Sequence, residues 1–253
     1  MAPFYIKSII VDNPYLTDQE LRKKTGSLLR PANSKESYHA DLTYIVEFKK
    51  LKSSIGRVIK MAKKEHIDSF FNEGTLQLGT FNYYKNFEDQ EIGDRSEGDY
   101  IVVGRHPVST LILEMEGGLN NYVFCCYDGE PEPKVIERFG YDDCFEITDL
   151  DGFSNAIIKS LDAVKFYKSR CVYKNDKVLV GDLPSGHDFR AVLTELKLDM
   201  DNEAKYFMKF PIYEHQNEFR FIWQMQNNKE VEEPLIINCP DAIEYCSRYP
   251  TSL

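Results

Sequence analysis

The sequence KFPIYEHQNEFRFIW, residues 209–223, carries the clearest secondary-structure signal in the chain. Apolar and polar residues alternate along it, which predicts a β-strand with one buried face and one solvent-facing face. Gln216, Glu218 and Arg220 are two residues apart, so a strand would present all three side chains on its polar face. Phe219 and Phe221 would then point into the core. We interpret the polar trio either as the edge of an active site or as an ordinary ion pair on a surface strand.

The composition is typical of a soluble globular protein. The chain has 253 residues, of which 42% are hydrophobic and 28% charged, and its formal net charge is -10. This charge excludes a protein whose whole surface binds nucleic acid, because phosphate binding needs an excess of Lys and Arg. A local basic groove remains compatible with the sequence.

Cysteine usage and hydropathy predict where the protein works. The six Cys residues show no zinc-binding spacing, and we interpret them as reduced thiols in a cytoplasmic protein. The first 25 residues lack the pattern of a signal peptide. Since there is also no uncharged apolar run of about 18 residues, we expect no membrane segment. The sequence gives no indication of the oligomeric state.

We divide the chain into an N-terminal elaboration at residues 1–52 and a single α+β domain at residues 53–253. Short apolar or alternating runs predict strands, and apolar residues at helical spacing predict helices. Strands are expected at residues 3–11, 56–61, 75–80, 100–103, 108–115, 121–127, 143–147 and 235–238, with a hairpin formed by 164–173 and 177–180. Helices are expected at residues 63–72, 152–161, 203–210 and 241–247, the first ending at Gly74. This balance predicts an α+β fold with a mainly antiparallel sheet and flanking helices.

Three pieces of sequence carry polar residues that could form one site. The first is Arg57, on the strand predicted at 56–61. The second is GTLQLGTFNYYK at residues 74–85, followed by DRSEG at 94–98. The third is Lys209 together with QNEFR at 216–220.

This order resembles the ADP-ribosyltransferase superfamily of the arginine–serine–glutamate type. That superfamily has an Arg on a first strand, a strand of small polar residues in the middle and a Gln/Glu-x-Glu motif on a late strand. The second and third pieces are also similar to bacterial families found among toxin-like and phage-defence genes. The resemblance covers roughly residues 55–225. It implies an ADP-ribosyltransferase-like split antiparallel sheet and NAD as the substrate.

The resemblance implies a role for each matching residue. Arg57 would contact the NAD pyrophosphate, because a guanidinium forms paired hydrogen bonds with phosphate oxygens. Glu218 would bind the 2′-hydroxyl of the nicotinamide-side ribose and stabilise the oxocarbenium-like cation that forms as nicotinamide leaves. Gln216 would orient the acceptor, and Tyr83 or Tyr84 would stack on the nicotinamide ring.

Arg220, on the same predicted strand face as Glu218, completes the expected cofactor-binding set. One part of the chain departs from the superfamily pattern. The middle strand of the superfamily usually presents Ser-Thr-Ser, whereas the stretch in the corresponding order here is FCCY at residues 124–127. The thiols of Cys125 and Cys126 are weaker hydrogen-bonding groups than hydroxyls. The departure leaves room for a site that binds NAD without turning it over.

We therefore expect a cytoplasmic protein of the ADP-ribosyltransferase or NAD glycohydrolase kind, acting in phage–host conflict as a toxin or in antiviral defence. It would use NAD to modify a macromolecular acceptor, protein or nucleic acid, or would hydrolyse NAD. An alternative is a non-enzymatic acidic interaction protein, an inhibitor or sensor in the same conflict. A third interpretation is a nuclease in which Asp94, Glu97 and Glu218 hold a divalent ion, although the residue spacings define no metal site.

Overall fold

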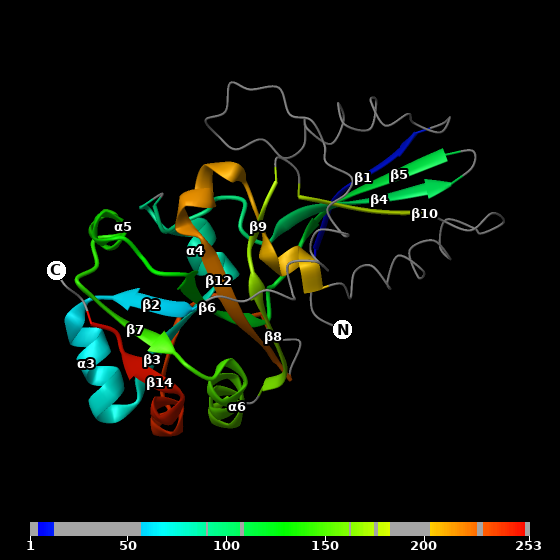
Figure 1. The fold of residues 1–253 in the computed structure, drawn as a ribbon. Helices are drawn as coiled ribbons and strands as arrows, with labels where there is room; N and C mark the ends of the chain where they lie inside the picture. Colours follow the sequence, from blue (N-terminus) through cyan, green and yellow to red (C-terminus); the bar gives the residue numbers. More distant parts are fainter. Residues whose placement is uncertain are drawn as a thin grey trace.

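The computed structural model describes residues 5–12, 57–89, 91–106, 109–161, 163–174, 177–182, 203–226 and 230–250 (Figure 1). Most of the predicted N-terminal elaboration lies outside these ranges, so this division of the chain stays a prediction. Its one described element is the strand β1 (Tyr5–Asp12), which lies where the sequence predicts a first strand.

The main sheet contains eight strands, and every strand pairing within it is antiparallel. Its principal path is β13-β3-β6-β2-β7-β14, while β12 pairs with both β6 and β8. The strands are β2 (Val58–Ala62), β3 (Thr75–Thr80), β6 (Asn121–Asp128), β7 (Asp143–Ile147), β8 (Ala163–Arg170), β12 (Glu218–Met225), β13 (Leu235–Asn238) and β14 (Cys246–Arg248). The sheet is thus organised around β6 and its neighbour β12.

Along β6, two strands share one edge without pairing with each other. β3 pairs with the first part of β6, up to Val123, and β2 pairs with its last part, from Tyr127. Residues 124–126 pair with neither of these strands, and we call the resulting space between β2 and β3 the strand gap. Lys60 of β2 reaches across it and donates a hydrogen bond from Nζ to the carbonyl oxygen of Cys125 at 3.0 Å.

A second sheet extends away from the main one, at the upper right of Figure 1, with the strand order β1-β5-β4-β10. Besides β1 it comprises β4 (Asp99–His106), β5 (Ser109–Glu116) and β10 (Val178–Asp182). The hairpin predicted from residues 164–173 and 177–180 is wrong, because β10 pairs in parallel with β4 while β8 pairs with β12. Two further strands form a short parallel pair: β9 (Val172–Tyr173), which follows β8 in the sequence, and β11 (Met208–Lys209), which precedes β12.

Helices flank the main sheet. α3 (Lys64–Glu73) contacts β3 and β7, and α6 (Leu150–Ser160) contacts β8, as the lower part of Figure 1 shows. Gly74 ends α3 with a left-handed φ of 76°, which confirms the predicted helix end. The remaining helices are short: α4 (Phe81–Asn86), α5 (Pro133–Arg138), η1 (Glu203–Phe207), η2 (Pro211–Gln216) and η3 (Pro240–Tyr245). The fold is mixed α/β with mostly antiparallel sheets, in agreement with the predicted α+β class.

The predicted central strand begins only at Glu218. The preceding residues form the 3-10 helix η2, because Pro211 fixes a φ suited to a helical first turn and has no N–H to offer a strand partner. Asn217 follows with a left-handed φ of 38°, and the chain turns there into β12. Gln216 therefore lies outside the strand, and its predicted place on the strand face of Glu218 is wrong.

The polar face of β12 is buried, although the alternating pattern predicted contact with solvent. Glu218 and Arg220 expose 5% and 1% of their surface, and Phe219 and Phe221 on the other face expose none. Residues of α3 and α6 cover the phenylalanine side. Residues of β4, β5 and η1 pack around Ile222 on the other side. Because β4 and β5 are remote from β12 in the sequence, the local pattern of β12 does not reveal this second layer.

We expect Phe221→Ala to lower the free energy of unfolding by about 3–5 kcal/mol, because it empties a fully buried site between the sheet and α6. Val164→Ala, at a side chain that is 57% exposed on β8, should cost less than about 1 kcal/mol. Urea titrations of both variants measure the two values. Equal losses would contradict the assigned core.

Candidate functional site

A cluster of buried polar side chains lies on the covered face of β12. We call it the ionic cluster. Each member exposes 7% of its surface or less, and the members are Glu97, Lys209, Gln216, Glu218 and Arg220. Burying an ionised group is costly unless a partner neutralises it, so the pairing within this cluster determines what it can do.

Glu218 accepts hydrogen bonds on both carboxylate oxygens. Arg220 donates from Nε to Oε1 at 2.6 Å, and Lys209 donates from Nζ to Oε2 at 2.7 Å. Burial alone would raise the pKa of Glu218, but the positive charges of Arg220 and Lys209 lower that pKa well below its ordinary value. Glu218 is therefore an ionised carboxylate at neutral pH.

Lys209 joins Glu218 to Gln216. Its Nζ also donates a hydrogen bond to Gln216 Oε1, and it lies 4.9 Å from the centre of the Tyr213 ring. Burial works to lower the pKa of Lys209, but the Glu218 carboxylate raises it above its ordinary value, so the amine stays charged. Gln216 in turn donates from Nε2 to the carbonyl oxygen of Glu91 at 2.7 Å. Gln216 thus enters the cluster from the end of η2.

Arg220 holds a second carboxylate through its terminal nitrogens. Its two Nη atoms donate to the two oxygens of Glu97, each at 2.7 Å, in the paired geometry that binds a carboxylate most firmly. One of them also donates to the carbonyl oxygen of Tyr206 at 2.9 Å. Arg220 therefore connects β12 with the segment before β4 and with η1.

The DRSEG segment is a turn that presents Glu97 to Arg220. Asp94 accepts hydrogen bonds on Oδ1 from the backbone N–H and the hydroxyl of Ser96, at 2.9 and 2.6 Å. Gly98 ends the turn with a φ of 79°. A Cβ atom at this position would lie 2.6 Å from the carbonyl oxygen of Gly117, which follows β5, so only glycine fits. Lys177 donates to Asp94 Oδ2 at 3.3 Å.

These contacts bear on the nuclease interpretation. Its three carboxylates each pair with a buried cation, and the pairs are Asp94–Lys177, Glu97–Arg220 and Glu218–Lys209. Within the part of the chain that the structure describes, no group of three His, Cys, Asp or Glu side chains is placed to hold a metal ion. The geometry does not support this interpretation.

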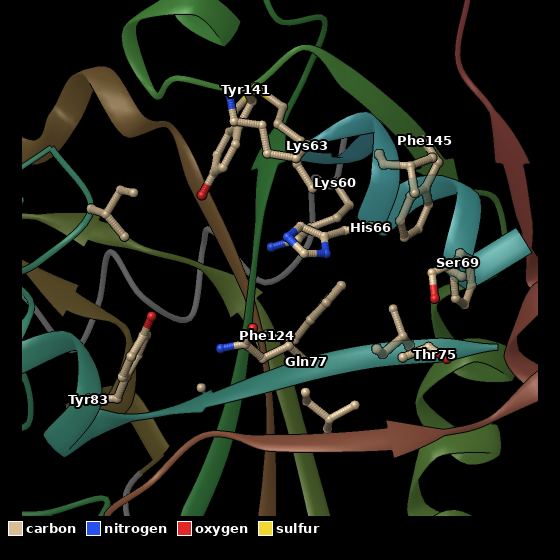
Figure 2. A pocket seen from close by; sticks show the side chains of 18 of the residues that line it. Lys60, Lys63, His66, Ser69, Thr75, Gln77, Tyr83, Phe124, Tyr141 and Phe145 are labelled. Atoms are coloured by element: carbon tan, nitrogen blue, oxygen red, sulfur yellow. The ribbon is translucent and has the colours of Figure 1, made fainter. Parts of the chain in front are cut away.

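Two adjoining cavities open beside the cluster. The smaller, of about 80 Å³, is bounded by the ionic cluster and by Tyr84 and Cys125. The larger, of about 290 Å³, occupies the strand gap between β2, α3 and β3 (Figure 2). Both are lined by the same five residues where they meet: Lys60, Met61, Tyr84, Ile92 and Tyr141. The two cavities therefore adjoin, and we call them together the hollow; Glu218 lines the smaller of the two.

Four of the six predicted site residues line the smaller cavity: Tyr84, Gln216, Glu218 and Arg220. Tyr83 lines the larger cavity, where its hydroxyl points inward (Figure 2). Burial raises the pKa of Tyr84, so its hydroxyl stays neutral beside the cluster.

Arg57 is the sixth predicted residue, and it lies outside both cavities. Its guanidinium pairs with Glu130 at 3.0 Å and with Glu146 at 3.5 Å, and its side chain is 51% exposed. Arg57 directly precedes β2, and its side chain is held by carboxylates at the surface and not by a residue of either cavity. The predicted meeting of Arg57 and Glu218 across one hollow is not found.

Cys125 occupies the place that the resemblance gives to a hydroxyl. It lies opposite Arg220 in the register of β6 and β12, and it lines the smaller cavity. Burial, reinforced by the Glu218 carboxylate, raises the pKa of the Cys125 thiol, so the sulfur stays protonated and can donate a hydrogen bond to Glu218. Cys126 points the other way, into the core beneath α3 and α6.

The sequence analysis missed the basic side chains of the hollow, Lys60, Lys63 and His66, which all line the larger cavity. The sequence predicted a short strand around Lys60 and gave that residue no role in the site. The signal that could have found it is a charged residue inside the otherwise apolar run VIKMA, because such a side chain must reach a polar partner. His66 is exposed on α3, and its ring faces the strand gap (Figure 2).

Comparisons of the chain with protein-family models, with curated proteins and with solved structures found no match. None of the helices in the described ranges is long and apolar enough to cross a membrane. The function is therefore inferred from the geometry of the site.

We expect Arg220→Met to lower the free energy of unfolding by about 3–5 kcal/mol, because it leaves two buried carboxylates without their shared cation. Adding Glu97→Gln to this variant should recover part of the loss. Arg248→Met, which removes an exposed pair with Asp68, should cost a small fraction as much. Denaturant titrations measure these values, and a mild effect of Arg220→Met would contradict the assigned pairing.

The acid stability of the protein should depend on Glu218. Because its pKa is lowered in the folded state, Glu218 stabilises the fold above its unfolded pKa of about 4.3, and this contribution is lost as the pH falls below that value. Glu218→Gln should therefore lose less stability than the wild type between about pH 5 and pH 3. Glu130→Gln, at an exposed carboxylate, should follow the wild type. Parallel wild-type and Glu218→Gln curves would contradict the pairing.

Proposed function

We propose that the chain is an ADP-ribosyltransferase-like protein that binds NAD in the strand gap and uses Glu218 as its catalytic carboxylate. The observation that supports this most is an ionised, buried carboxylate that lines the smaller cavity, beside the strand gap of a mainly antiparallel sheet. The strand gap is compatible with the split sheet that the resemblance implies. The cytoplasmic location and the setting in phage–host conflict rest on the sequence alone.

The chemistry follows from the charge on Glu218. Breaking the bond between nicotinamide and ribose leaves a cationic sugar, and a fixed carboxylate stabilises that charge as it develops. Lys209 and Arg220 keep Glu218 ionised and fix its orientation. The acceptor, a macromolecular nucleophile or water, would then attack the sugar carbon, and Gln216 would orient it. Tyr84, on the cavity wall, would stack on the nicotinamide ring.

The size of the hollow limits how much of NAD it encloses. The larger cavity, at about 290 Å³, is at the lower end of the range of small-molecule pockets. We therefore expect one end of the dinucleotide to be enclosed and the other to extend past the opening. Arg57 lines neither cavity, so the pyrophosphate contact that the resemblance implies for it does not fit this site.

One observation favours a non-catalytic role for Glu218. Both oxygens of Glu218 already accept hydrogen bonds from Lys209 and Arg220, and the Cys125 thiol lies beside them. A ribose hydroxyl would have to compete with these donors. The alternative function is a non-enzymatic acidic interaction protein, an inhibitor or sensor in phage–host conflict, in which the ionic cluster only stiffens the fold.

Incubation with NAD distinguishes the two functions. The wild type should release nicotinamide, detected by mass spectrometry, and Glu218→Gln should slow the release roughly 100- to 1,000-fold because it removes the anion beside the cationic sugar. Glu130→Gln, which leaves the hollow intact, should release nicotinamide at the wild-type rate.

Absence of NAD binding at millimolar concentration by calorimetry, or an unchanged rate in Glu218→Gln, would contradict the transferase proposal. Recovery of one stoichiometric protein partner, with binding indifferent to Glu218→Gln, would support the interaction protein instead. Wild-type thermal stability in the presence and absence of NAD provides an independent check on binding, since a ligand of the folded state raises the unfolding temperature.

A further inference from the structure

The larger cavity has a charge character opposite to that of the whole chain. The chain carries a formal net charge of -10, yet no Asp or Glu is among the residues that line this cavity. Its ionisable lining consists of Lys60, Lys63 and His66, together with tyrosines. A concave surface with one sign of charge concentrates ligands of the opposite sign, and here that sign is negative.

Lys60 is the basic residue that both cavities share. Its Nζ donates to the carbonyl oxygen of Cys125 at 3.0 Å and lies 4.5 Å from the centre of the Phe124 ring. In the described part of the chain, Lys60 forms no ion pair with a carboxylate. Since an ammonium group carries further N–H donors, Lys60 can bind an anion without giving up the Cys125 carbonyl.

The backbone of β6 supplies a second donor beside Lys60. In an antiparallel strand the N–H and the carbonyl of one residue point to the same edge. The Cys125 carbonyl points into the strand gap, where it meets Lys60, so the Cys125 N–H faces the gap as well. Neither β2 nor β3 pairs with β6 at this position. Cys125 lines the smaller cavity and Lys60 lines both, so a ligand oxygen placed where the two cavities adjoin would accept from both groups.

Aromatic and amide side chains surround these donors. The walls of the larger cavity include Tyr83, Tyr84, Phe87 and Tyr141. Figure 2 shows Lys60, His66 and Gln77 directed into the space between α3 and β3, with the Tyr83 and Tyr141 hydroxyls facing it. Flat aromatic walls favour a ring by stacking, and the Gln77 amide can recognise its polar edge.

We infer that the larger cavity is a binding site for a mononucleotide-like group, an aromatic base joined to a phosphate, and that Lys60 is the cation that holds the phosphate. This inference rests on the proposed function, because NAD contains two such groups, and it deepens that function by naming the part of the ligand that the larger cavity binds. It gives to Lys60 the phosphate contact that the resemblance implies for Arg57. The base stacks between the tyrosines of the wall.

Calorimetric titration with AMP and with adenosine tests the site. The wild type should bind AMP about tenfold more tightly than adenosine, and more salt should reduce this difference. Lys60→Met should weaken AMP roughly 10- to 100-fold, the range expected for a lost charge-assisted hydrogen bond, and leave adenosine almost unchanged. Lys64→Met removes the same charge from an exposed residue that lines neither cavity, and should bind AMP as the wild type does.

The inference would be overturned by no binding of AMP, by equal affinity for AMP and adenosine, or by an unchanged AMP affinity in Lys60→Met. A loss of both ligands in Lys60→Met would also overturn it, once unchanged thermal unfolding shows that the variant is folded. The outcome is separable from that of the transferase proposal. If AMP binds through Lys60 but NAD is not cleaved, the binding site stands and the transferase proposal fails. If a Lys60→Met variant cleaves NAD and binds AMP with wild-type affinity, the transferase proposal stands and the inference about Lys60 fails.

Discussion

The balance of charge around Arg220 is the constraint on which the rest of the structure depends. This buried guanidinium binds Glu97 through two hydrogen bonds and Glu218 through Nε, so it joins the turn before β4 to the main sheet. Removing ionised groups from water costs several kcal/mol for each ion, and the mutual pairing offsets that cost. Apolar residues of similar volume often stabilise a core equally well. A buried group of ions is therefore weak evidence for stability, and its observed effect here is to hold both carboxylate oxygens of Glu218 in place.

The ionic cluster and the strand gap are two consequences of the same central strands. β12 supplies Glu218 and Arg220 on one face, and β6 beside it supplies Cys125 between them and the gap. Because β2 and β3 share the far edge of β6 without pairing with each other, the hollow opens directly beside the carboxylate. A reactive group placed on paired strands is held more rigidly than one on a loop, which suits either catalysis or selective binding.

The sequence predicted the class of the fold, the burial of Phe219 and Phe221, and the part that Glu218 and Arg220 play in one polar site. It did not predict that their face is covered, because the covering residues belong to η1, whose sequence does not show where it packs, and to β4 and β5, far earlier in the chain. Local chemistry also overrode the alternation at Pro211, which starts a 3-10 helix where a strand was expected. The position of Lys60 in the site could not be predicted, because it depends on a hydrogen bond to the carbonyl oxygen of Cys125 on β6, a partner that the local sequence does not show.

The interrupted edge of β6 also has a mechanical consequence. The β3–β13 pair and the β2–β7–β14 group both pair with β6 but share no strand pairing with each other, while α3 contacts both groups. No main-chain hydrogen bond between strands joins the two groups directly, and the Lys60–Cys125 bond is a side-chain tether between β2 and β6. The width of the strand gap is therefore set by side-chain packing, above all by α3 across both groups of strands, and not by a ladder of main-chain hydrogen bonds.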